Sequence, residues 1–103
     1  MNYTSLIVKI IEKPEQSFLN NNIPFTQVLA KFYQFRNNHY NTCKLLIWGN
    51  LSDNLIKYYQ INDYVIIEGY ISRRKSNIKD YNILNEIEIS VFKIYPFALN
   101  NAV

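Results

Sequence analysis

The chain has 103 residues and a net charge of +3, which suits one small domain and permits a polyanionic partner. Its single cysteine excludes an internal disulfide and a structural zinc site of the usual multi-cysteine type. No stretch reaches the roughly 20 apolar residues of a membrane span, and the first residues lack a basic region and a cleavage signal. We therefore expect no membrane association and a protein that works in the compartment where it is made.

Strand patterns and one helix pattern follow one another along the chain. Apolar and β-branched runs, or alternation with a period of two, predict strands at 3–11, 25–36, 42–48, 64–75 and 83–95. Leu51, Leu55 and Tyr59 fall at helical spacing, and Ser52 or Asn50 is the expected cap of that helix. Loops are predicted at 12–24, 37–41 and 76–82, with a turn at 62–63.

The order of elements is therefore β-β-β-α-β-β. A five-stranded barrel with a helix between its third and fourth strands is the OB-fold arrangement, an all-β architecture with one helix. We expect a single OB-fold domain over residues 1–103, with its core in 3–95 and a short tail in 96–103. Gly49, at the change from strand to helix, and Gly69, inside a strand, fit the sharp backbone bends of a small barrel.

Aromatic and basic residues alternate with the expected core residues along these strands. If Leu45 and Ile47 point inward, then Lys44 and Trp48 share the outer face. Cations can follow the phosphates of a single strand while aromatic rings stack on its unpaired bases. The residues expected to contact nucleic acid are Lys31, Tyr33, Phe35, Lys44, Trp48, Tyr70, Arg73, Arg74 and Lys75.

Six of these nine residues also have a structural interpretation. Trp48 could belong to the core, Tyr33 and Phe35 to a subunit interface, and the run 73–75 to an ordinary solvated hairpin. The three tyrosines at 58, 59 and 64 are expected to pack around the helix rather than contact a ligand.

No catalytic set is present in the sequence. His39 and Cys43 are four residues apart, and we interpret them as a solvated loop histidine and a half-buried strand cysteine. The acidic residues are scattered, and there is no phosphate-binding glycine loop or metal-ligand spacing. We expect neither a metal nor a cofactor, and no enzymatic activity.

Two segments, Leu46–Asp53 and Val65–Lys75, resemble segments of the bacterial-type single-stranded DNA-binding protein family. Leu46-Ile-Trp-Gly-Asn-Leu-Ser-Asp53 is similar to the segment in which an aromatic residue and a glycine precede the helix. Val65-Ile-Ile-Glu-Gly-Tyr-Ile-Ser-Arg-Arg-Lys75 is similar to the fourth-strand signature, Glu-Gly followed by a basic hairpin. Pro14-Glu15 and the last strand match more weakly, so that the resemblance covers roughly residues 5–95.

The resemblance implies an OB-fold that binds single-stranded DNA with little sequence preference and forms homodimers or homotetramers. It implies that Trp48 stacks on bases and that Lys44 and Arg74 are basic contacts. The family's other tryptophans are Thr42 and Ser76 here, and its long tail with an acidic tip is missing, so we do not expect recruitment of replication proteins.

The compact form and the abundance of Asn, Ile, Lys, Tyr and Phe, whose codons are rich in A and T, resemble plastid-encoded relatives. A plastid, or otherwise a bacterial cytoplasm, is the expected location. The short tail is similar to that of the related primosomal replication protein. The alternatives are an OB-fold protein-interaction subunit with weak nucleic-acid affinity, and binding to RNA.

Overall fold

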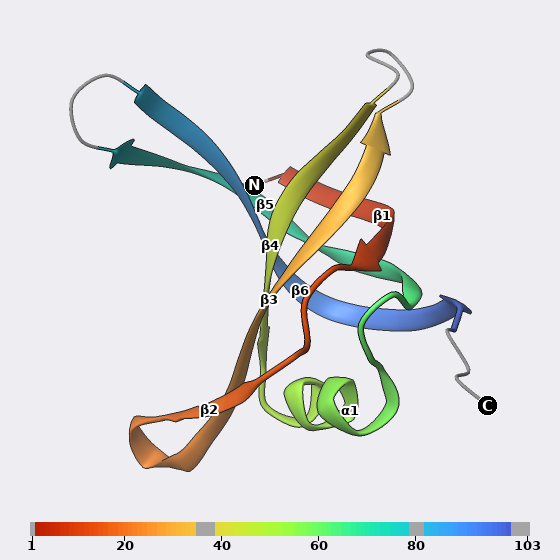
Figure 1. The fold of residues 1–103 in the computed structure, drawn as a ribbon. Helices are drawn as coiled ribbons and strands as arrows, with labels where there is room; N and C mark the ends of the chain where they lie inside the picture. The colour runs from red at the N-terminus through yellow and green to blue at the C-terminus, as the bar shows by residue number, and fades with distance from the viewer. Residues whose placement is uncertain (1, 35–38, 79–81, 100–103) are drawn as a thin grey trace.

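In the described part of the chain, six strands form one sheet and a helix packs against it. The computed structural model describes residues 2–34, 39–78 and 82–99. The elements are β1 (Asn2–Ile10), β2 (Gln16–Leu19), the 3-10 turn η1 (Asn20–Asn22), β3 (Ile23–Gln34), β4 (His39–Trp48), α1 (Asn50–Tyr58), β5 (Tyr64–Ile78) and β6 (Asn82–Ala98) (Figure 1).

The strands close into a barrel. They are hydrogen-bonded in the order β1-β5-β6-β4-β3-β2, and an additional pairing of β1 with β3 joins the two sides. β4 and β6 run parallel, while the other neighbours are antiparallel. β2 extends the edge of β3 outside the closed ring of five strands. The predicted OB-fold barrel is confirmed.

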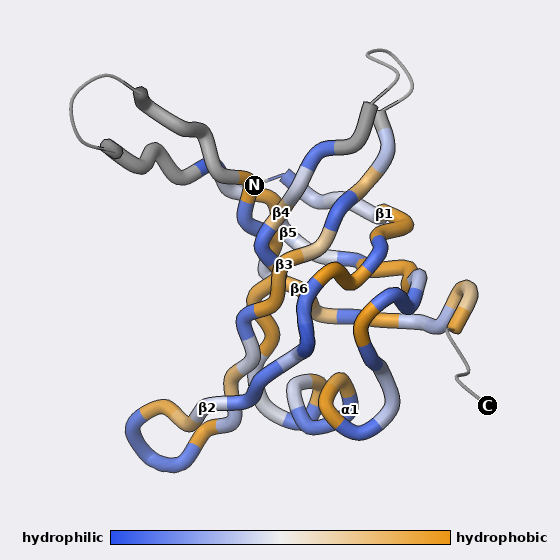
Figure 2. Tube along the Cα trace, viewed as in Figure 1, coloured by the Kyte–Doolittle hydropathy of each residue, from blue (hydrophilic) through white to orange (hydrophobic). Residues whose placement is uncertain are grey.

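The core follows the alternation predicted from the sequence. Apolar residues alternate with polar ones along the strands (Figure 2). Among the residues whose side chains are described, the buried apolar ones are Val8, Ile10, Val28, Ala30, Cys43, Leu45, Ile47, Leu55, Val65, Ile67, Ile89 and Val91. Full burial of a valine, leucine or isoleucine side chain stabilises the folded state by about 1.5–3 kcal/mol. The same alternation turns Lys44 and Trp48 to the outer face of the barrel.

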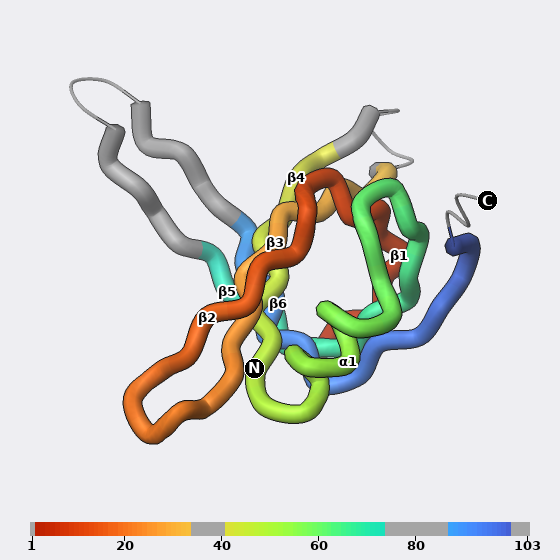
Figure 3. The backbone as a smooth tube through the Cα atoms, turned by 60° about the horizontal axis from the view of Figure 1, so that its bottom comes forward, coloured from red at the N-terminus to blue at the C-terminus, as the bar shows by residue number. Residues whose placement is uncertain are grey.

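The helix α1 lies at one end of the barrel (Figure 3). Its Leu55 is fully buried, and the hydroxyl of Ser52 forms a buried hydrogen bond of 2.6 Å with that of Thr26. The prediction that Ser52 or Asn50 caps the helix is wrong. The N-cap is Gly49, at φ +66°, and no side chain caps the helix, because the Ser52 hydroxyl is used to join α1 to β3.

Gly69 lies where β5 and β6 change register. The register shifts between Glu68 and Gly69, so that Phe92 of β6 has no partner residue opposite it in β5. A Cβ atom on Gly69 would lie 2.4 Å from the carbonyl oxygen of Ser90 and 2.9 Å from a side-chain carbon of Ile89. The glycine therefore allows the two backbones to approach closely at a bend of the barrel.

Several predicted boundaries are wrong. Gln16–Leu19, predicted as loop, forms β2 on the edge of β3. The polar segment from Ser76 is largely strand, since β5 and β6 stay paired as far as Ile78 and Asn82. β6 also continues to Ala98, beyond the predicted start of the tail at residue 96. Cross-strand pairing extends the strands into these segments, including the polar one from Ser76. No helix in the described ranges is long and apolar enough to span a bilayer.

Candidate nucleic-acid interface

The outer face of the β3–β4 hairpin brings together four of the predicted contact residues. In the antiparallel register Phe25 is opposite Trp48, Leu29 is opposite Lys44, and Lys31 is opposite Thr42. Residues directly opposite each other share one face of a sheet. We call the surface formed by Phe25, Lys31, Tyr33, Lys44 and Trp48 the hairpin face.

Trp48 is a surface residue, and its interpretation as core is wrong. Its side chain is 41% exposed. It is held in place by Phe25, whose ring centroid lies 5.2 Å from that of Trp48 at an interplanar angle of 40°. Such offset aromatic pairs contribute about 0.5–1.5 kcal/mol beyond the area that they bury. The contact with Phe25 orients the Trp48 ring but leaves much of it exposed. A ring that stacks on a base has to be exposed in this way.

The basic residues of the hairpin face lie along the same strands. Lys31 and Lys44 are half-buried, and Tyr33 is exposed. Half-burial of a lysine on a sheet is typical of a stem that packs on its neighbours while the ammonium group reaches solvent. The parallel pairing of β4 with β6 places Glu88 level with Lys44. The hairpin face therefore combines cations with aromatic rings and has a carboxylate on its β6 side.

The remaining predicted cations belong to β5. Arg73 is exposed, on the part of β5 that pairs with β6 beyond the core. The side chains of Arg74 and Lys75 lie outside the described residues, as does the whole of Phe35. Their participation stays a prediction.

Tyr70 belongs to a different cluster. Its ring lies 6.4 Å from that of Tyr3 and 5.3 Å from that of Phe92, and the rings of Tyr3 and Phe92 are 5.8 Å apart. We call these three residues the aromatic triad. The triad lies on the outer face of β1, β5 and β6. Across the sheet, Tyr70 of β5 is opposite Ser90 of β6, and Ser90 is in turn opposite Leu46 of β4, so that β6 lies between Tyr70 and the strand that carries Trp48. The structure therefore does not group Tyr70 with Trp48.

One member of the aromatic triad, Tyr3, binds a carboxylate. The Tyr3 hydroxyl donates a hydrogen bond to Glu68, which lowers the pKa of the Glu68 carboxyl, with a smaller contribution from Tyr95, and raises the pKa of Tyr3. Tyr3 and Phe92 were not among the predicted residues. They became neighbours of Tyr70 through the β1–β5 pairing and the β6 bulge, neither of which is visible in the sequence.

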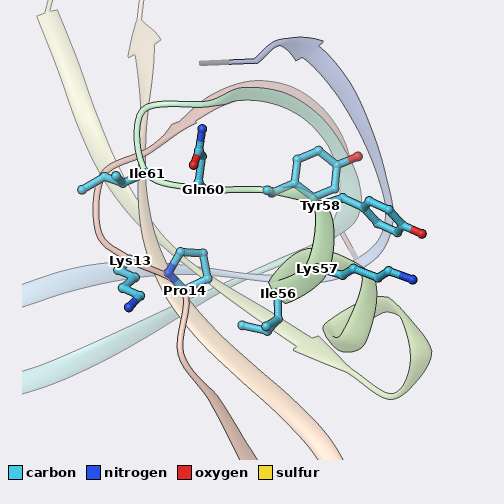
Figure 4. Close-up of a pocket in the computed structure, with 8 residues that line it drawn as sticks. Lys13, Pro14, Ile56, Lys57, Tyr58, Gln60 and Ile61 are labelled. Carbon is cyan, nitrogen blue, oxygen red and sulfur yellow. The ribbon is translucent and has the colours of Figure 1, made fainter. Parts of the chain in front are cut away.

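Tyr58, Tyr59 and Tyr64 differ in exposure and in the residues that they contact. The prediction that Tyr58 packs around the helix is wrong, since it is 60% exposed, with the Lys57 ammonium 5.2 Å from its ring centroid. It borders a hollow of about 440 Å³ between the end of α1 and Pro14 (Figure 4). Tyr59 does pack against the core, and burial raises the pKa of its hydroxyl. Tyr64 packs beside Lys9.

Of the two residues considered for catalysis or metal binding, one is buried in the core. Cys43 is a core residue rather than a half-buried one, and burial raises the pKa of its thiol to about 12. A buried thiol with a raised pKa is a poor nucleophile at neutral pH. His39 begins β4 instead of lying in a loop, and its side chain is outside the described residues. Over the described ranges, no three His, Cys, Asp or Glu side chains are grouped in a way that could hold a metal ion.

One curated relative is similar over nearly the whole chain. It is a protein of Trieres chinensis named "Putative single-stranded DNA-binding protein ycf41", 48% identical over 105 residues, which cover 98% of this chain and 93% of the relative. No protein-family model matches the chain.

Solved structures share the fold at low identity. The single-stranded DNA-binding domain of a Synechococcus protein superposes with a TM-score of 0.73 at 22% identity, covering 92% of this chain and 94% of that one. The small single-stranded DNA-binding protein of Streptomyces coelicolor gives 0.77 at 16% identity, covering 92% and 93%. The mitochondrial protein Rim1 of S. cerevisiae gives 0.74 at 11% identity, covering 97% of each chain. These likenesses show the barrel architecture.

Proposed function

The chain belongs to the ycf41 family of single-stranded DNA-binding proteins, and from that premise we propose that it binds single-stranded DNA with little sequence preference. The observation that carries the proposal is the exposed ring of Trp48, braced by Phe25 on the same face as Lys44. Binding of this kind serves DNA replication and repair. The relatives compared above are named for binding, which supports a binding role rather than a catalytic one.

The physical basis is a combination of stacking and phosphate contacts. Stacking on an aromatic ring contributes about 1–3 kcal/mol per base and tolerates any base, because every base has a π-face. Lys31 and Lys44 would lie along the phosphates, with Tyr33 as a second ring. We propose that Phe35, Arg73, Arg74 and Lys75 extend the contact surface along the two hairpins.

A fluorescence titration tests this proposal directly. Trp48 is the single tryptophan of the chain, so that its emission reports on the hairpin face alone. We expect oligo-dT to quench it at low salt and the affinity to fall as salt rises, with a log–log slope of about −0.7 per phosphate contact. Lack of quenching at low salt would contradict the proposal. Competition with an RNA oligonucleotide of matched sequence separates DNA from RNA binding, because the 2′-OH is the distinguishing group.

A protein-interaction role is the second candidate. The tip of the β2–β3 hairpin exposes three large apolar residues, Phe18, Leu19 and Ile23. Exposed apolar clusters are typical of interaction sites. A stable protein partner in a pull-down, together with no shift of an oligonucleotide in a gel, would favour this role over DNA binding.

We further propose that the chain forms homodimers or homotetramers through the aromatic triad. Phe92 and Tyr70 are each about two-fifths exposed although they pack against each other, and Tyr95, near Tyr3, is exposed as well. An aromatic surface of this kind is stabilised when a second copy covers it. The family resemblance described above implies assemblies of two or four copies.

The expected mass of the assembly is a multiple of 12.3 kDa. Phe92→Asp should shift it toward the monomer, since the new carboxylate would be brought next to Glu68 inside the interface. Light scattering after size exclusion measures the mass, and Tyr58→Asp, which changes an exposed ring elsewhere, is the matched control. A mass of 12.3 kDa for the unmodified protein at all concentrations would contradict the assembly.

We propose a plastid stroma as the location. The name of the Trieres chinensis relative and the preference for residues with A/T-rich codons support it. Sequencing of the source genome would decide between a plastid gene and a bacterial one, for which the cytoplasm would be the location.

A further inference from the structure

The barrel closes at a short seam between β1 and β3. These strands pair at Lys9 with Lys31 and at Ile10 with Ala30. On its other side, Lys9 is opposite Tyr64 of β5. The register thus sets Lys31, Lys9 and Tyr64 side by side on the outer face of three neighbouring strands, and the Lys9 ammonium lies 5.6 Å from the centroid of the Tyr64 ring.

Beyond the seam the two strands separate around a hollow of about 450 Å³. It is lined by Ser5, Leu6, Ile7, Lys9, Lys31, Phe32, Tyr33 and Tyr64. We call it the seam pocket. Its lining includes two lysines, two tyrosines and three apolar side chains, and none of the described residues that line it is acidic. Its size falls within the range of about 300–1,000 Å³ that is usual for small-molecule sites.

The electrostatics of the seam pocket favour an anion. Two lysines directly opposite each other in antiparallel strands repel each other, which destabilises the pair. An anion between the two ammonium groups removes this repulsion and forms a charge-assisted hydrogen bond with each. A phosphate diester is such an anion, and the tyrosine rings beside it offer a surface for the attached base.

We propose that the seam pocket binds one nucleotide unit of the single-stranded DNA, with its phosphate between Lys9 and Lys31 and its base against Tyr64 and Tyr33. This inference rests on the proposed function and extends its site. Lys31 and Tyr33 belong to both the hairpin face and the seam pocket, so they connect the two surfaces. The DNA strand therefore continues from β3 across the seam onto β1 and β5.

The test compares two lysines in similar settings. Lys9→Gln removes a charge at the seam, while Lys57→Gln removes one that also lies over a tyrosine ring but in the last turn of α1, outside the hairpin face. With an oligo-dT longer than the roughly 4–16 nucleotides that one OB-fold covers, Lys9→Gln should weaken binding about threefold to tenfold at low salt. It should also reduce the steepness of the log–log salt dependence by about 0.7. Lys57→Gln should leave both unchanged.

If Lys9→Gln and the unmodified protein have the same affinity and the same slope of the log–log salt dependence, the proposal that the seam pocket binds a nucleotide is overturned. The proposed function would remain intact. No binding by the unmodified protein would overturn both. A second measurement needs no variant: photo-cross-linking with oligo-dT that contains 4-thiothymidine. Cross-links to Tyr64 support the proposal, and cross-links confined to β3 and β4 overturn it.

Discussion

Gly69→Ala is expected to lower the free energy of unfolding by about 3 kcal/mol, a large share of the roughly 5–15 kcal/mol that stabilise a small domain. The added methyl group would lie 2.4 Å from the Ser90 carbonyl oxygen, and a backbone atom in a paired strand cannot move aside as the end of a flexible side chain can. The two strands must separate at the bulge, which disturbs the packing of Ile89 in the core. The midpoint of urea unfolding measures the loss.

Ser72→Ala is the matched control. Ser72 is an exposed residue three positions further along β5, so its replacement by alanine, a change of one heavy atom as at Gly69, should shift the midpoint very little. If Gly69→Ala unfolds at the same urea concentration as Ser72→Ala, the close approach of β5 and β6 at the bulge does not constrain the fold.

Trp48→Ala is expected to weaken the binding of oligo-dT by about 5- to 150-fold, which corresponds to the loss of one base-stacking contact of about 1–3 kcal/mol. Trp48→Phe should keep much of the affinity, because a smaller ring still stacks on Phe25 and on a base. Since the ring is well exposed, neither change should unfold the protein. Anisotropy of a labelled oligonucleotide measures binding without the tryptophan signal.

Tyr58→Ala provides the comparison for Trp48→Ala. It removes another exposed aromatic ring, at the end of α1 rather than on the hairpin face, and should leave the affinity unchanged. Equal affinities for the two alanine variants would contradict the assignment of Trp48 as the stacking residue.

The fold was largely predictable because the barrel strands carry strong local signals. Alternation of apolar residues identified the core side of β3, β4 and β5, and the two glycines marked the bends. Boundaries failed where tertiary pairing overrides local composition. Ser76 and Asn77 are polar and typical of loops, yet they pair with Leu84 and Ile83 across the β5–β6 hairpin.

The candidate site was predictable only in part, because register was not. Alternation places Lys44 and Trp48 on the outer face, but it does not say which residue of β3 is opposite them. The loop predicted at 37–41 implies a different register from the observed one, in which Gln34 pairs with His39. For that reason Phe25 was missed as the neighbour of Trp48. Tyr70 was assigned to the outer face correctly, but its neighbours depend on pairing with the distant β1.

The pairing of β1 also has a consequence for the synthesis of the protein. The main partner of β1 is β5, beginning with Lys9 opposite Tyr64, whereas β1 meets β3 only at the short seam. The ribosome makes β1 first and β5 some 55 residues later, which takes roughly 3–11 seconds at about 5–20 residues per second. Over that interval β3 and β4 can already form their hairpin, while the apolar first strand has no complete sheet to join. The N-terminal strand is therefore the part of the nascent chain that most needs protection from premature association.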